Sequence, residues 1–420
     1  MNPAAAPPIN SRFVSLLTAL SDNPYLAAIR AGMVSVVPLT IIGGLFMVFA
    51  NLPLPGWETR IEKFLPLLQV PVTATFGMLA VFVCFAIGYD FGKQLKQEAI
   101  VSASMATLVF LLIQVEMKDQ TLKMSGLGSQ GLFTAILVAL ITVRVQKFFT
   151  DQNLVVRLPE SVPAIVYESF LSLSPMFFLI VAFWILRFVL GVDINEWVQT
   201  AFKPLVFTLN TLPGILVYAF AVTLLWSVGI NGDNTMDAVV APVFLQYLAA
   251  NVEAISHGQA PPYITALGFF TTYVNVGGTG ATIALALIML NSKEPGFRKV
   301  SRLSLPTQIF QINEPIFFGF PIVLNPIFMV PYILNALLLT AGTYLLMHWH
   351  ILQKPFVSVP WTTPPIIGHY LVSGGDWKAA VWGLISILIA MAVYFPFAKA
   401  AERKRLLAEA SATTDGTPRA

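Results

Sequence analysis

The chain has 420 residues, of which 56% are hydrophobic and only 11% are charged, and its mean hydropathy is +0.76. Soluble domains contain roughly 25% charged residues, so this composition excludes an ordinary soluble protein and predicts an all-α protein that crosses the membrane several times. The net charge of +3 gives no indication of nucleic-acid binding, and one cysteine and four scattered histidines predict neither a disulfide framework nor a metal or cofactor site.

The N-terminal half is a series of apolar runs joined by short polar segments. Residues 1–10 lack the basic start and short apolar core of a signal peptide, and residues 11–23 have the apolar spacing of an amphipathic surface helix. The runs that predict membrane spans over the whole chain are 28–52, 73–89, 100–115, 131–147, 170–190, 212–229, 327–347 and 380–397.

Positive charges follow the second, the fourth and the last of these spans, which predicts the orientation of the chain. The basic residues concerned are Lys93 and Lys96, then Arg144, Lys147 and Arg157, and finally the tail 403–405. Loops rich in Lys and Arg stay in the cytoplasm. We therefore expect a multi-pass membrane protein with both termini cytoplasmic.

From Trp226 onward, polar residues and glycines interrupt the apolar runs. The interruptions are Gly229–Asn234, Asn275–Gly280 and Gln311–Pro326, and the apolar segments between them (264–270, 281–290 and 316–324) are too short to cross a core about 30 Å thick. Irregular backbone at membrane depth lines a cavity or is buried in protein, so these segments predict re-entrant hairpins. We expect a scaffold domain over 1–225, a substrate domain over 226–398 and a disordered cytoplasmic tail over 399–420.

Glu314 is the main candidate for a functional residue. It stands in Asn313-Glu314-Pro315, inside an apolar run. A carboxylate at membrane depth costs a few kcal/mol and needs a partner or a function. Glu314 either accepts a hydrogen bond from a polar substrate and takes its proton, or is a solvated, structural residue at the end of a hairpin.

Two other polar stretches each have two possible interpretations. Asn275–Thr282 either presents backbone N–H groups at a helix N-terminus or allows close packing of helices. Asn231–Asn234 is either a helix end with its loop or part of a binding site. Neither pattern matches the P-loop, because no Gly-Lys-Ser/Thr follows.

Several long motifs in order resemble enzyme IIC, the membrane subunit of bacterial sugar phosphotransferase systems, in its lactose/cellobiose/diacetylchitobiose group. The motifs are 28–30, 38–39, 43–44, 128–133, 158–163, 225–232, 277–282, 312–316 with 325–326, 360–365 and 374–377. The resemblance implies a homodimer with about ten transmembrane helices, two re-entrant hairpins and an elevator-type movement of the substrate domain.

The resemblance also implies a function and a site. A IIC permease translocates a small oligosaccharide, here a β-linked disaccharide, and presents it for phosphorylation by a cysteine phosphate on a separate IIB protein. Glu314 matches the catalytic glutamate of the family. The substrate-binding residues expected with it are Asn231, Asn313, Gly278, Thr279, Gly280 and Asn325.

One position departs from the family. Asn231 stands where the family usually has a histidine, and an amide cannot titrate near neutral pH. A second hypothesis is therefore a IIC-derived carrier or membrane sensor that binds sugar without phosphorylating it. A third, a proton-coupled carrier that uses Glu314, is weakened because few other carboxylates are expected at membrane depth.

Overall fold

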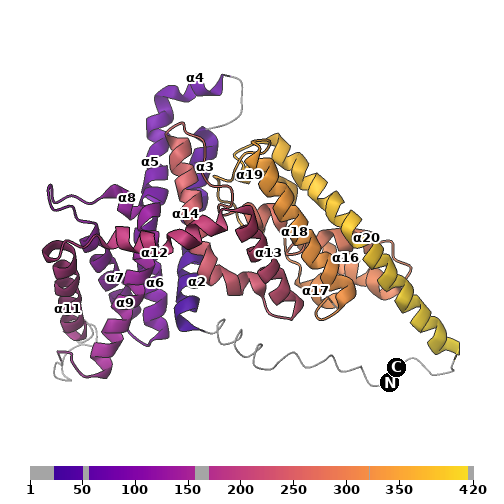
Figure 1. Cartoon of the computed structure of the whole chain (residues 1–420), viewed down its shortest axis with the longest axis horizontal. Helices are drawn as coiled ribbons and strands as arrows, with labels where there is room; N and C mark the ends of the chain where they lie inside the picture. Colours follow the sequence, from indigo (N-terminus) through magenta and orange to yellow (C-terminus); the bar gives the residue numbers. More distant parts are fainter. Residues whose placement is uncertain (1–22, 51–55, 157–169, 321, 415–420) are drawn as a thin grey trace.

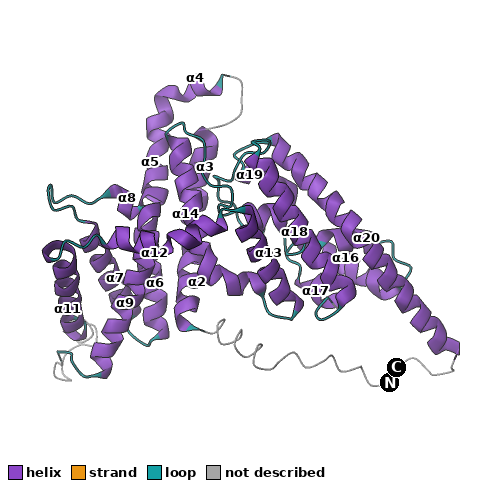
Figure 2. Ribbon diagram, viewed as in Figure 1, coloured by secondary structure: helices purple, strands orange, loops and turns teal. Residues whose placement is uncertain are grey.

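The computed structural model describes residues 23–50, 56–156, 170–320 and 322–414. The regular secondary structure of these parts is helical, with one isolated bridge between Val115 and Leu122, and Figure 2 shows the helices joined by loops. The N-terminal α-helices are α2 (Pro24–Ser35), α3 (Val37–Ala50), α4 (Trp57–Ile61), α5 (Leu65–Thr75), α6 (Leu79–Gln94), α7 (Ala99–Gln114), α8 (Met124–Leu127), α9 (Leu132–Asp151), α11 (Leu173–Trp184) and α12 (Ile194–Leu209).

The second half begins with α13 and contains two short helices at the polar interruptions. Its α-helices are α13 (Leu212–Ser227), α14 (Gly232–Ser256), α15 (Ile283–Met289), α16 (Pro295–Ile309), α17 (Glu314–Gly319), α18 (Pro326–His348), α19 (Pro365–Val372) and α20 (Trp377–Thr414). A π-helix, Phe269–Val274, precedes the glycine-rich loop.

Helix α6 is the centre of the N-terminal group and packs against α2, α7 and α9 (Figure 1). Small residues make this possible. A Cβ added at Gly32 would lie 3.1 Å from the backbone nitrogen of Ile87, and one at Gly88 would lie 3.0 Å from Cα of Ala103. Helices in a membrane pack most closely where such small residues face each other.

In the C-terminal group, α18 packs against α13 and α20, and α20 also contacts α15 and α19. Helix α14 joins the two groups, because it packs against α13 and also against α2 (Figure 1). Across this junction the guanidinium of Arg30 donates a hydrogen bond of 3.1 Å to the carbonyl of Asn234.

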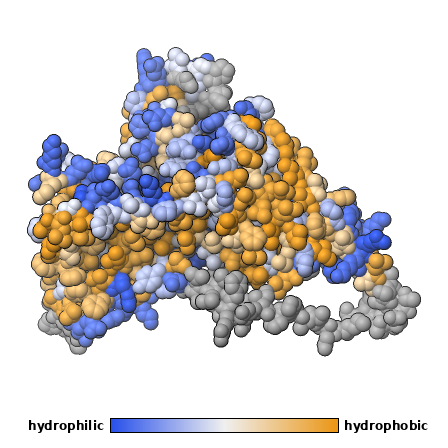
Figure 3. All heavy atoms as spheres, in the orientation of Figure 1, coloured by the Kyte–Doolittle hydropathy of each residue, from blue (hydrophilic) through white to orange (hydrophobic). Residues whose placement is uncertain are grey.

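Six helices in the described residues are long and apolar enough to cross a membrane: 24–50, 59–94, 129–151, 239–256, 326–348 and 377–408. A seventh span results if α11 with its π-helical end and α12 count together, although they are bent by 87°. Figure 3 shows apolar side chains across the visible face, with hydrophilic ones gathered near α4 and near the end of α20. The structure therefore agrees with a polytopic helical membrane protein.

The structure corrects the sequence prediction in two places. The span 239–256 was missed, because polar side chains such as Asn251 interrupt its hydrophobic pattern, and that amide is buried against the carbonyls of Tyr263 and Pro355. The tail was predicted to be disordered from 399, but α20 continues to Thr414. The amphipathic helix predicted for 11–23 lies almost entirely outside the described residues.

A buried carboxylate holds the end of α20. Glu402 is only 5% exposed. It accepts hydrogen bonds from the hydroxyl of Ser292 (2.7 Å) and from the backbone N–H of Lys293, and it pairs with Lys399 at 2.8 Å. Helix α20 is thereby fixed to the loop before α16, which explains why its charged end is ordered.

Replacing Glu402 by Ala should destabilise this end of the protein. The change leaves the Ser292 hydroxyl and the Lys293 N–H without their acceptor, and such a loss costs about 1–3 kcal/mol per buried group. We expect the Tm in detergent to fall by a few degrees and hydrogen exchange to accelerate over 399–408. Lys404→Ala, an exposed change on the same turn, is the control; equal Tm values for the two variants would contradict the role of Glu402.

Candidate functional site

The glycine-rich loop is buried, although it is not helical. It lies between the π-helix and α15, and three of its glycines have positive φ, Gly277 (+73°), Gly278 (+101°) and Gly280 (+76°), as does Ala281 (+55°). Side chains disfavour this region of the Ramachandran plot. Glycine is also needed for space, because a Cβ at Gly280 would lie 2.9 Å from Cγ of the Tyr332 ring and closer still to other ring atoms.

The segment before Glu314 supplies hydrogen bonds to this loop. The side-chain oxygen of Gln311 accepts from the backbone N–H groups of Gly277 (3.0 Å) and Gly278 (3.3 Å). The side-chain amide of Asn313 donates to the carbonyl of Thr279 at 3.1 Å. Two irregular segments that are more than 30 residues apart in sequence therefore satisfy each other's polar groups.

Glu314 is exposed beside this junction. It is the first residue of the short helix α17, whereas the neighbouring Asn313 is only 4% exposed. The carboxylate therefore projects from a segment that Asn313 fixes to the loop. The structure places Gly278, Thr279, Asn313 and Glu314, four of the site residues expected from the family resemblance, on two segments that contact each other.

Asp233 at the start of α14 makes a third connection to the loop. One carboxylate oxygen accepts from the indole N–H of Trp226 (2.8 Å) and from the hydroxyl of Thr279 (2.5 Å), and the other accepts from the Asn275 amide at 3.3 Å. Trp226 lies at the end of α13, and its ring packs edge-on against Phe317 of α17 at 5.0 Å. Helices α13, α14 and α17 thus meet at the loop.

Asn231 and Asn325 have other roles in this structure. Each caps a helix: the Asn231 side-chain oxygen accepts from the N–H of Asn234 (2.9 Å) at the start of α14, and that of Asn325 accepts from Ile327 (3.2 Å) at the start of α18. The segment that contains Asn325 nevertheless contacts the end of α13, where Trp226 lies. The N–H of Leu324, next to Asn325, donates to the carbonyl of Ser227 at 2.9 Å.

Sequence reasoning passed over Tyr332. Its side chain is fully buried between Gly280 and Phe317, and its hydroxyl has no hydrogen-bond partner within the described part of the chain. No sequence pattern indicated this residue, because a tyrosine in an apolar span resembles an ordinary core residue.

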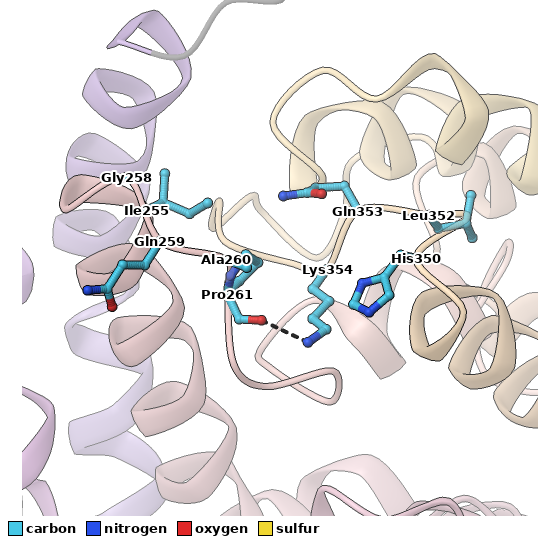
Figure 4. Close-up of a pocket in the computed structure, with 9 residues that line it drawn as sticks. All are labelled: Ile255, Gly258, Gln259, Ala260, Pro261, His350, Leu352, Gln353 and Lys354. Carbon is cyan, nitrogen blue, oxygen red and sulfur yellow. Dashed lines mark hydrogen bonds between the residues drawn. The ribbon is translucent and has the colours of Figure 1, made fainter.

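A cavity of about 320 Å³ lies elsewhere, at the C-terminal end of α14 (Figure 4). The Lys354 ammonium reaches across to the carbonyl of Pro261 (2.8 Å), and burial lowers the pKa of this lysine. At about 1.5 Å per residue, the 25 residues of α14 separate this cavity from Asp233 by roughly 35 Å. Its lining residues, Ile255, Gly258, Gln259, Ala260, Pro261, His350, Leu352, Gln353 and Lys354, include none of the predicted site residues.

The packing of Gly278 against Asn313 gives a direct test of the site's geometry. A Cβ at position 278 would lie 2.7 Å from Cγ of Asn313 and closer still to its Cβ. Gly278→Ala should therefore add overpacking of about 1–3 kcal/mol to the left-handed strain of about 1–2 kcal/mol. We expect a clearly lower Tm in detergent and a smaller folded fraction.

Gly258→Ala is a matched control for this change. Gly258 has φ +68°, and nothing lies within 4 Å of an added Cβ, so this variant has the backbone strain without the clash. Equal loss of stability in the two variants would show that the contact between Gly278 and Asn313 is not as tight as described.

Comparison with known proteins shows the family. The model of the phosphotransferase system EIIC family matches residues 30–336. The lichenan permease IIC component of Bacillus subtilis (strain 168) is 33% identical over 96% of this chain and 94% of its own length. The cellobiose-specific EIIC component of Geobacillus stearothermophilus is 32% identical over 93% of this chain and 92% of its own.

A solved structure agrees with these matches. The crystal structure of the transporter ChbC, the IIC component of an N,N'-diacetylchitobiose-specific phosphotransferase system, superimposes with a TM-score of 0.89 and 30% identity, covering 97% of this chain and 99% of that one. The chain therefore belongs to the EIIC family of the phosphotransferase system and is a multi-pass membrane protein.

Proposed function

We propose that this chain is the sugar permease of a phosphotransferase system, and that it carries a small β-linked oligosaccharide and presents it to a IIB protein for phosphorylation. The observation that carries this proposal is the exposed carboxylate of Glu314, fixed through Asn313 to a buried glycine-rich loop. A rigid support for one exposed carboxylate is what positioning of a reacting hydroxyl requires.

The substrate class follows from the relatives. Those described above are named for lichenan, cellobiose and N,N'-diacetylchitobiose, which are all β-linked glycans. We infer a disaccharide of cellobiose or diacetylchitobiose type, bound beside Glu314, whose segment Thr279 and Asn313 hold through their hydrogen bond. Asn231 and Asn325 then contribute through the helix starts that they cap.

The chemistry assigned to Glu314 is proton acceptance. The sugar hydroxyl oxygen attacks phosphorus in the cysteine phosphate of IIB, the P–S bond breaks and the thiolate leaves with the electron pair. The hydroxyl proton passes to the Glu314 carboxylate. A positioned base of this kind contributes roughly 10²- to 10⁴-fold to a rate.

The larger architecture belongs to the same proposal. We infer about ten transmembrane helices with two re-entrant hairpins around 275–282 and 311–326, a scaffold over 1–225, a moving substrate domain over 226–398, and a homodimer. Lys93 at the end of α6 and Lys147 near the end of α9 support a cytoplasmic location of these ends in the inner membrane. The start of α2 and the end of α20 lie toward the same side in Figure 1, which supports cytoplasmic termini.

Vesicles reconstituted with the protein test the function. We expect labelled cellobiose or diacetylchitobiose to accumulate inside as its phosphate, and only when IIB and its phosphate supply are enclosed. Accumulation of unmodified sugar without IIB would contradict the proposal and would favour the carrier hypothesis that Asn231 suggested.

Glu314→Gln tests the role of the carboxylate. The amide keeps the size of the side chain but cannot take a proton, so the rate of phosphosugar formation with purified IIB should fall by about 10²- to 10⁴-fold. Glu253→Gln removes an exposed carboxylate at the far end of α14 and should leave the rate unchanged. An unchanged rate in Glu314→Gln would remove Glu314 from the mechanism.

A further inference from the structure

Three segments of the site are held by one partly buried side chain, that of Asp233. Asp233 accepts hydrogen bonds from Trp226 on α13 and from Asn275 and Thr279 on the glycine-rich loop. It also lies in the first turn of α14, where the helix dipole favours a negative charge. These donors account for a carboxylate in a region where an unpartnered charge would be costly.

Thr279 continues this connection toward Glu314. Its hydroxyl donates to Asp233, and its own carbonyl accepts from the side-chain amide of Asn313 at 3.1 Å. Asn313 directly precedes Glu314, the first residue of α17. Asp233 is therefore connected to Glu314 by a hydrogen bond to Thr279, a second hydrogen bond from Thr279 to Asn313, and the peptide bond between Asn313 and Glu314.

The Asn231 side chain does not connect α14 to the glycine-rich loop, although it stands two residues before Asp233. Its side-chain oxygen is used in capping α14 by accepting from Asn234. In this chain the polar connection between α14 and the glycine-rich loop is made by Asp233. Asp237, one turn further along α14, makes none of these three hydrogen bonds.

We propose that Asp233 is the positioning residue for Glu314, acting through Thr279 and Asn313. This inference rests on the proposed function, since it assigns how the phosphorylation site is held. Removal of the hydrogen bond between Asp233 and Thr279 leaves the Glu314 carboxylate itself unchanged but allows the segment that carries it to move. The rate of phosphoryl transfer at saturating sugar should then fall more than the affinity for sugar.

Thr279→Val and Thr279→Ser separate the hydrogen bond from the shape of the side chain. Valine keeps the shape and loses the hydroxyl, whereas serine keeps the hydroxyl. We expect Thr279→Val to lower the rate at saturating sugar by roughly ten- to a hundredfold, the effect of losing one hydrogen bond to a charged group, with KM changed much less. Thr279→Ser should stay within about threefold of the wild type.

Asp233→Asn should reproduce the loss in Thr279→Val, and the double variant should be no worse than either single one, because both changes break the same link. Asp237→Asn is the control on the same helix face and should not reproduce the loss. A rise in KM without loss of rate, or equal losses in Thr279→Ser and Thr279→Val, would overturn the proposal, since Thr279 would then be a direct sugar ligand or a packing residue.

Hydrogen exchange tests the link without phosphorylation. Residues 311–319 should exchange faster in Thr279→Val and Asp233→Asn than in the wild type and Thr279→Ser. Unchanged exchange would overturn the positioning role. If the wild-type protein forms no phosphosugar, the proposed function fails, and the exchange measurement still decides whether Asp233 holds the Glu314 segment.

Discussion

A buried backbone segment that does not form a helix has to satisfy its amide groups with other parts of the protein, because an unpaired buried amide is costly. In the glycine-rich loop 275–280, two backbone N–H groups donate to the side chain of Gln311, and one carbonyl accepts from the side-chain amide of Asn313. The two segments that interrupt the helical pattern are thus complementary. The exposed carboxylate of Glu314 is a consequence of this pairing, since Asn313 fixes the start of α17 to the loop.

Close packing turns this pairing into a defined geometry. Gly278 lets the loop approach the side chain of Asn313, and Gly280 lets it approach the ring of Tyr332. The hydroxyl of Tyr394 donates to the carbonyl of Gly280 at 2.8 Å and ties the loop to α20. The site is therefore supported by α14, α17, α18 and α20 together, and a permease that moves its substrate domain would carry these parts as one unit.

Much of this arrangement could be predicted from the sequence, because apolar runs and their interruptions follow directly from the cost of burying polar groups. The pattern indicated the long helix α18, whereas Gly278, Thr279, Asn313 and Glu314 were expected as site residues from the family resemblance. It missed the span in α14, where Asn251 is buried against two carbonyls from distant loops. It also failed for residues 399–414, because the contact of Glu402 with Ser292 depends on residues 110 positions apart. Sequence analysis considered Asn231 rather than Asp233, since only the folded chain shows which side chain reaches the loop.

The proposed function requires that sugar binds where Glu314 projects beside the glycine-rich loop. A structure of this protein with cellobiose or diacetylchitobiose bound tests this most directly. We expect a sugar hydroxyl within hydrogen-bond distance of the Glu314 carboxylate, with Asp233 still bonded to Thr279. A sugar bound instead in the cavity beside Lys354, or elsewhere away from Glu314, would contradict it.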